Sequence, residues 1–280
     1  MELNVWKVRA LLVFVLSLCV TVTIALFSGE PEAIKVDSSV LPALPVSQEQ
    51  VIGDRTLQEQ QKSRDANNLK PNQTANTAIR YRPRYEISWA HPLNYGERFA
   101  RDIYGRTVTN QPIIVLHETV YSATSAINFF QTPHVNENQQ ASYHTLIKLD
   151  GTVIYIVPPD KRAFGAANSI FEGENGPETV KTHPKFPPSV NNFAYHVSLE
   201  TPPDGRNNKR KHSGYTNAQY RSLAWLIAQS QVPDSRITTH QFVDRSGSRI
   251  DPRSFDTNKF LNLLHSFRRE SSKLTLNTIN

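Results

Sequence analysis

We predict a mixed α/β (α+β) domain, a central mixed sheet flanked by helices, over residues 83–280 of this 280-residue chain. Three patterns carry the prediction. A short continuous apolar run suits a buried strand, alternating runs around an Asp-Gly pair suit a hairpin, and two amphipathic stretches have helical spacing. These segments interleave without an internal repeat, which is typical of helices packed on one sheet.

The first expected element is a buried strand over Pro112–Thr119, where four aliphatic residues stand in succession. A helix should follow over Ser122–Gln131, with apolar side chains at helical spacing. Tyr143–Pro158 is predicted to be a hairpin because alternating apolar runs flank Asp150–Gly151, a pair suited to a type I′ turn. Tyr195–Glu200 is expected to be another strand.

Two more helices complete the prediction. The segment Thr216–Gln219 matches a capping box and should open a helix that ends near Gln229. Asp256 or Thr257 would cap a last helix. The long polar loops expected between these elements are Asn168–Asn192 and Thr201–Gly214.

Residues 1–27 have the features of an export segment. The stretch from Ala10 to Phe27 is uncharged and follows Lys7 and Arg9, and about 20 apolar residues suffice to cross a membrane. Basic residues before such a segment keep its start inside and send the following chain across. An uncleaved signal-anchor fits the length, whereas a cleaved signal peptide would need a better processing site than Ala25–Gly29. We therefore expect a periplasmic or cell-surface protein, anchored or secreted.

Residues 28–82 are predicted to form a flexible stalk. Residues 28–80 contain no Phe, Tyr or Trp, although aromatic residues make up 9% of the chain, so the segment has little apolar surface to offset its ordering entropy. The net charge of residues 28–82 is zero, residues 1–27 carry +1, and the remaining +5 of the total +6 falls on residues 83–280. That bias is too weak to indicate nucleic acid but favours an anionic polymer.

Composition and missing motifs exclude several classes of protein. With 38% hydrophobic and 20% charged residues, the chain is not a multi-span membrane protein. Its single cysteine, Cys19, excludes an intramolecular disulfide framework and lies in the export segment, away from any folded site. The sequence lacks the serine-hydrolase G-x-S-x-G, the phosphate-binding G-x-x-x-x-G-K-[ST] and the H-E-x-x-H zinc motif.

Two histidines and one aspartate are candidate metal ligands. His117 directly follows the apolar run, His240 follows Arg236–Thr239, and Asp251 comes eleven residues later. Two imidazoles and a carboxylate form a three-ligand zinc set that leaves a fourth position for water, and zinc lowers the pKa of that water to about 7. Because 123 residues separate His117 from His240, ordinary structural roles for the histidines remain an alternative at this point.

Four stretches across residues 110–265 strengthen the metal hypothesis: Ile113–Thr119; Ser142–Val153; Val197–Glu200 with Gly214–Tyr220; and Ile237–His240 with Ile250–Pro252 and Phe255. In this order they resemble the zinc-dependent N-acetylmuramoyl-L-alanine amidase family, which includes phage-lysozyme-type amidases and peptidoglycan recognition proteins. The resemblance implies that fold and a Zn²⁺ cofactor on the three candidate ligands. It also implies hydrolysis of the amide bond between N-acetylmuramic acid and L-alanine in peptidoglycan.

The resemblance also implies roles for three further residues. Glu200 takes the position of an acid that works on the attacking water, and Tyr143 that of a catalytic tyrosine. Arg249 takes the position of a lysine that stabilises the oxyanion, and its planar, longer cation changes the geometry there. A second departure is Gly165, at the position where the family usually has a histidine after an aromatic residue.

Two other functions stay open at this stage. A peptidoglycan-binding recognition module would hold the polymer without cutting it, although such modules usually lack one of the ligands, and a different amide substrate would be compatible with the fold. The alternative role for Glu200 is an ordinary surface acid, and the alternative role for Tyr143 is a residue that only packs against its hairpin. Glu118 is expected to face water and His144 to be structural. The histidines expected to be solvated are His134, His183, His196 and His212.

Overall fold

A computed structural model describes residues 41–42 and 81–279, with side chains up to residue 270. Its centre is a six-stranded mixed sheet in the order β1-β5-β4-β9-β3-β10. Only β4 and β5 are antiparallel neighbours, and the other adjacent pairs are parallel. The strands of this sheet are β1 (Tyr85–Ile87), β3 (Ile113–Glu118), β4 (Thr145–Ile147), β5 (Val153–Tyr155), β9 (Ala194–Leu199) and β10 (Ile237–Thr239).

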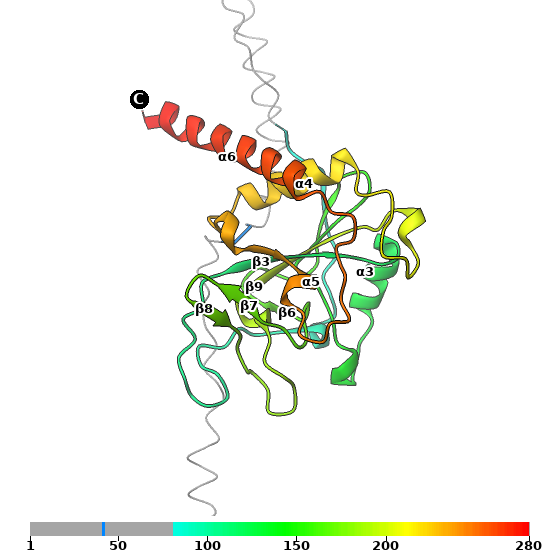
Figure 1. The fold of residues 1–280 in the computed structure, drawn as a ribbon, viewed down its shortest axis with the longest axis vertical. Coiled ribbons are helices and arrows are strands. Elements are labelled where there is room, and N and C mark those ends of the chain that lie inside the picture. The colour runs from blue at the N-terminus through cyan, green and yellow to red at the C-terminus, as the bar shows by residue number, and fades with distance from the viewer. Residues whose placement is uncertain (1–40, 43–80, 280) are drawn as a thin grey trace, which may run out of the picture.

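Helices cover both faces of this sheet, which confirms the predicted fold class. On one face α4 (Asn217–Ala228) and α6 (Thr257–Ile279) pack together over β3 and β9 (Figure 1). The other face carries α3 (Ala123–Gln131) and α5 (His240–Val243). The short 3-10 helices are η2 (Pro92–Asn94), η3 (Glu137–Gln139), η4 (Val190–Asn192), η5 (Pro203–Gly205) and η6 (Asp234–Arg236).

The helix starts follow the expected capping chemistry. Ser122 accepts a hydrogen bond from Ser125 N at the start of α3, and Thr216 with Gln219 forms the complete capping box of α4. Asp256 accepts from Lys259 N at the start of α6. Each cap satisfies a backbone N–H that the helix leaves unpaired at its first turn, so these starts are set by local sequence.

The central strands β3 and β9 are buried along their whole length. Their alternate residues face two separate apolar clusters, because successive side chains of a strand point to opposite faces. Leu116 and Val197 pack in the cluster under α4 and α6, whereas Val115 and Ala194 belong to the cluster on the opposite face. Burial on both faces explains the continuous apolar run Ile113–Leu116 of β3.

The hairpin turn differs from the expected type I′. That turn needs positive φ at both central residues, yet only Gly151, at 85°, has it, and Asp150 does not. Lys148 O accepts from Gly151 N, and Lys148 N donates to Thr152 O. Asp150 instead accepts from Thr152 N, so its side chain caps a three-residue loop that needs only one left-handed residue.

One expected loop contains further strands. Within Asn168–Asn192, β7 (Phe171–Gly173) and β8 (Gly176–Glu178) pair as an antiparallel hairpin. A second small sheet joins β2 (Tyr95–Gly96) to β6 (Arg162–Ala163). These strands have only two or three residues each, too few to show the alternation from which strands are predicted.

The amino-terminal predictions fall mostly on residues outside the described ones. The export segment, residues 1–27, and nearly all of residues 28–80 are among them. In the described part of the chain, no helix is long and apolar enough to span a membrane. Leu41 and Pro42 are described and buried, and Leu41 is 1% exposed within the core cluster under α4 and α6.

Candidate metal centre

The three predicted ligands meet at one edge of the sheet. His117 lies near the carboxyl end of β3, and His240 follows β10 directly as the first residue of α5. Because β3 and β10 are parallel neighbours, their carboxyl ends lie side by side. Asp251 reaches the same place from the loop before α6. The topology thus brings together residues that are 123 positions apart in the chain.

The three side chains form a compact, buried group. One nitrogen or oxygen atom from each lies within 4.8 Å of the other two. His240 Nδ1 is 3.1 Å from an Asp251 carboxylate oxygen, and His117 Nδ1 is 3.5 Å from it. His117 is fully buried, and His240 and Asp251 are less than 10% exposed. We call these three residues the metal triad.

Two of the three triad residues, His117 and Asp251, are in the protonation states that metal binding requires. Burial lowers the pKa of His117 to about 4, so its imidazole is neutral at neutral pH. Burial alone would raise the pKa of Asp251, but the neighbouring His117 and His240 outweigh it and hold that pKa well below its usual range. Neutral imidazoles and an ionised carboxylate are the forms that bind a metal ion.

His117 leaves one ring nitrogen available. Its Nε2 lies 2.9 Å from Nδ1 of His196, whereas its buried Nδ1 makes no hydrogen bond among the described residues. A buried polar atom without a partner costs about 1–3 kcal/mol, and a cation at the triad would remove that cost. The donor set, two imidazoles and a carboxylate, fits zinc.

Tyr143 and Arg249 also lie at the triad. The ring of Tyr143 stacks on His117, with centroids 4.4 Å apart, and burial raises the pKa of its hydroxyl, which therefore stays protonated. Arg249 is exposed, and its positive charge adds to the effect of burial in lowering the pKa of His117. Its guanidinium has no hydrogen bond or ion pair with the described residues, which leaves it free for an anionic group.

Glu200, by contrast, makes its hydrogen bonds away from the triad. It follows β9, is 8% exposed, and its two oxygens accept from the backbone N–H groups of Ala123 and Leu149, each at 3.0 Å. Arg206 lies 3.4 Å from the same carboxylate. The carboxylate therefore ties the start of α3 and the β4–β5 hairpin to β9, and its catalytic role stays a prediction.

Three expectations about solvated residues are wrong. His196 is buried under His117, and the side chains of Glu118 and His212 are also buried, 3.1 Å apart on the opposite side of β3. Tertiary packing covers all three side chains. His144 is buried as expected, and its Nδ1 accepts from the backbone N–H of His196.

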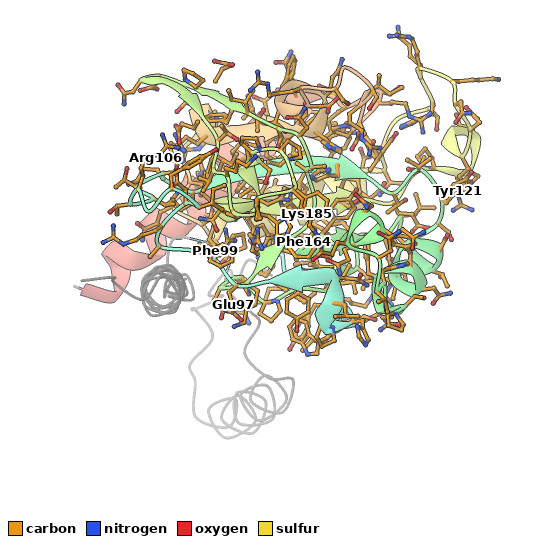
Figure 2. All side chains as sticks on the ribbon, turned by 90° about the horizontal axis from the view of Figure 1, so that it is seen from below. Glu97, Phe99, Arg106, Tyr121, Phe164 and Lys185 are labelled. Atoms are coloured by element: carbon orange, nitrogen blue, oxygen red, sulfur yellow. The ribbon has the colours of Figure 1, made fainter. Side chains whose placement is uncertain are left out.

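Position 165 shows why the expected histidine is missing there. A Cβ atom on Gly165 would lie 2.5 Å from the ring of His196, closer than real side chains approach. The preceding Phe164, labelled in Figure 2, holds this segment: its ring faces the guanidinium of Arg162 at 5.1 Å, and its N–H donates to Ser142 Oγ. His196 occupies the space that a side chain at position 165 would need.

The sequence profile of the N-acetylmuramoyl-L-alanine amidase family matches residues 108–254, which include the whole metal triad, Tyr143, Glu200 and Arg249. No curated protein matches the chain. Several solved structures are similar to it at low sequence identity.

A selenomethionine derivative of AmpD has 23% identity and a TM-score of 0.45, over 65% of this chain and 94% of that one. The endolysin amidase LysCS from Clostridium intestinale has 17% identity and a TM-score of 0.39, over 66% and 97%. AmpDh3 from Pseudomonas aeruginosa, in complex with an anhydromuramic pentapeptide, has 18% identity and a TM-score of 0.40, over 56% and 63%.

Proposed function

This chain belongs to the N-acetylmuramoyl-L-alanine amidase family and is a peptidoglycan hydrolase, and we propose that it uses a zinc ion held by His117, His240 and Asp251. The bond it cuts joins N-acetylmuramic acid to L-alanine. The observation that carries the proposal is the metal triad, whose three buried side chains bring one donor atom each within 4.8 Å of the other two, inside the matched region. The complete ligand set argues against a module that only binds the polymer.

The chemistry that zinc supplies in such a site is Lewis acidity, which polarises a carbonyl group and activates water at neutral pH. The residues around the triad supply the rest. Arg249, with its free guanidinium, would stabilise the negative charge that develops on the carbonyl oxygen. Tyr143, held protonated by burial, can donate a hydrogen bond to the substrate at the same place.

Glu200 is the proposed general acid–base. Hydrolysis of an amide requires a group that takes a proton from water and passes it to the leaving nitrogen. Its position after β9, the neighbour of β3, supports this role. Among the described residues, Glu200 Oε2 accepts only from Leu149 N, so this oxygen keeps a lone pair with which it can accept a proton from water.

Substrate and location fit the distribution of charge. The loop between β9 and α4 carries Arg206, Lys209, Arg210 and Lys211, of which the last three are exposed. This basic loop favours anionic wall polymers. We further propose that residues 1–27 place the domain on the periplasmic or outer side of the membrane, where peptidoglycan lies.

Digestion of purified sacculi tests the proposal. The full chain, loaded with zinc in detergent, should release L-alanine amino termini, and a chelator should stop the release until zinc is restored. His240→Ala should lose both bound zinc and cleavage, by about 1,000-fold or more because the triad is incomplete. Glu200→Gln should keep its zinc and lose cleavage.

Two results would contradict the zinc-dependent cleavage, and a third would contradict the role of Glu200. Cleavage that survives chelation and His240→Ala would remove zinc from the mechanism. Zinc-loaded protein that binds sacculi but releases no amino termini, beside an active amidase as positive control, would leave only a binding module. Glu200→Gln with unchanged cleavage would confine Glu200 to its structural hydrogen bonds.

A further inference from the structure

Among the described side chains, only His196 makes a hydrogen bond with Nε2 of the buried ligand His117. It lies on β9 and is fully buried. In the β3–β9 ladder, His196 pairs with Val115, two residues before His117 on the same face of the sheet. Its ring therefore stands beside the ring of His117, with centroids 5.1 Å apart.

Both the backbone and the ring of His196 are held in place by neighbouring residues. Its backbone N–H donates to His144 Nδ1, and its backbone carbonyl accepts from His144 N. Behind it, Gly165 leaves the space that the ring fills, because a Cβ there would lie 2.5 Å from both Cγ and Nδ1 of His196. These contacts fix the place from which Nδ1 meets His117.

The position of the triad decides the direction of this hydrogen bond. Asp251 lies on the Nδ1 side of His117, at 3.5 Å, so a metal at the triad would use the Nδ1 lone pair. A neutral imidazole then carries its proton on Nε2 and donates it to His196 Nδ1. A ligand histidine is usually oriented in this way by an acceptor on its other nitrogen.

We propose that His196 is a positioning residue for the metal centre: it accepts the Nε2–H of His117 and so directs His117 Nδ1 toward the metal. This inference rests on the proposed zinc site. It also explains the glycine at position 165, since His196 and a side chain at that position exclude each other. The two positions form a coupled pair.

Zinc affinity of the full chain tests the inference, measured by competition with a chromogenic chelator. His196→Phe keeps a ring of similar size under Gly165 but has no acceptor, and we expect zinc to bind about 10–100-fold more weakly. His196→Asn places an amide oxygen near the position of Nδ1 and should restore affinity to within a few-fold of the parent. Tyr195→Phe, in the same strand and on the opposite face, is the matched control and should bind zinc like the parent.

Cobalt substitution gives a second readout that packing alone would not change. The visible absorption of Co²⁺ at the site should shift in His196→Phe and return toward the parent spectrum in His196→Asn. Melting temperatures of the metal-free variants separate loss of folding from loss of orientation. For the zinc-loaded parent, long-range ¹H–¹⁵N spectra should show His117 protonated at Nε2.

Equal zinc affinities of the parent and His196→Phe would overturn the inference, and so would equal weakening by Phe and Asn. If His196→Phe does not fold, the parent spectra decide: a proton on Nδ1 of His117 in the zinc-loaded protein overturns it. Tight zinc binding by the parent with no cleavage of sacculi would instead overturn the proposed function and leave the role of His196 intact.

Discussion

Two neighbouring residues of β3 show two different uses of buried polarity. The side chain of His117 is part of the metal triad, whereas the side chain of Glu118, the next residue, lies on the opposite face of the sheet. Glu118 is 2% exposed and is bound by Arg253, by Tyr215 Oη at 2.8 Å and by His212 Nε2 at 3.1 Å. We call these four residues the carboxylate clamp.

The carboxylate clamp makes its hydrogen bonds entirely within the protein, whereas the metal triad leaves one buried atom without a hydrogen bond in the described part of the chain. Arg253, which is 4% exposed, also donates to the backbone carbonyls of Gly205, Asn207 and Lys209, so its donors have partners. His117 Nδ1 has no hydrogen bond among the described residues. A polar group whose partners are all protein atoms serves the fold, whereas a buried ring nitrogen without a partner, beside two other metal-binding side chains, can take a ligand from outside the protein.

The largest change in folding stability should come from lowering the pH, which affects the buried histidines on the triad side of β3. Burial lowers the pKa of His117 to about 4 and the pKa values of His144 and His196 well below their usual range. The unfolded chain, with histidine pKa values near 6.5, therefore binds more protons than the folded one as pH falls below that value. We expect the metal-free protein to lose stability between about pH 7 and 5: His117 contributes about 2 kcal/mol of this loss, and His144 and His196 add to it.

Urea denaturation with excess chelator at both pH values measures this loss. His144→Gln removes one of the three buried imidazoles and should flatten the dependence on pH. A stability that stays constant over this range would mean that the imidazoles are accessible to protons in the folded state.

A smaller effect should come from breaking the clamp. Glu118→Gln leaves the Arg253 cation buried without its counter-charge, and such a loss costs about 3 kcal/mol. Denaturation of the metal-free protein at neutral pH gives the value, and a double-mutant cycle with Arg253→Gln isolates the pair. A loss under about 1 kcal/mol would place Glu118 in contact with water, as its sequence context suggests.

The smallest effect should come from Tyr215→Phe. This change removes one hydrogen bond to the Glu118 carboxylate and leaves the ring packing in place, so we expect a loss of about 1.5 kcal/mol. Zinc affinity should not change, because the hydroxyl lies on the other side of β3. A variant with weaker zinc binding and unchanged stability would show that the two faces are coupled.

Much of the architecture could be predicted because local signals determine it. The apolar run of β3, the capping box of α4 and the Asp-Gly turn each act over a few residues. The ligand trio could be proposed because His117 and His240 both follow predicted strands and because the stretches around them resemble a known amidase family. The sequence profile of the family extends over all three ligands.

The partners of those residues could not be predicted. Strand alternation places His117 and Glu118 on opposite faces of the sheet. It does not predict that His196, 79 residues after His117, hydrogen-bonds the ring of His117. Arg253 meets Glu118 from 135 residues away. Such pairs depend on loop paths and side-chain packing, which leave no periodic signal in the sequence. The one related feature visible in the sequence is the glycine at position 165, beside which the ring of His196 packs.

The burial of Leu41 bears on how far the enzyme can work from a membrane. The segment expected to be a stalk begins at residue 28, yet Leu41 already belongs to the domain core. While Leu41 stays there, only residues 28–40 separate the proposed anchor from the folded domain, and a fully extended chain of that length spans at most roughly 45 Å. If residues 1–27 hold the protein at the membrane as proposed, the catalytic domain would then reach only the layer of wall nearest the membrane.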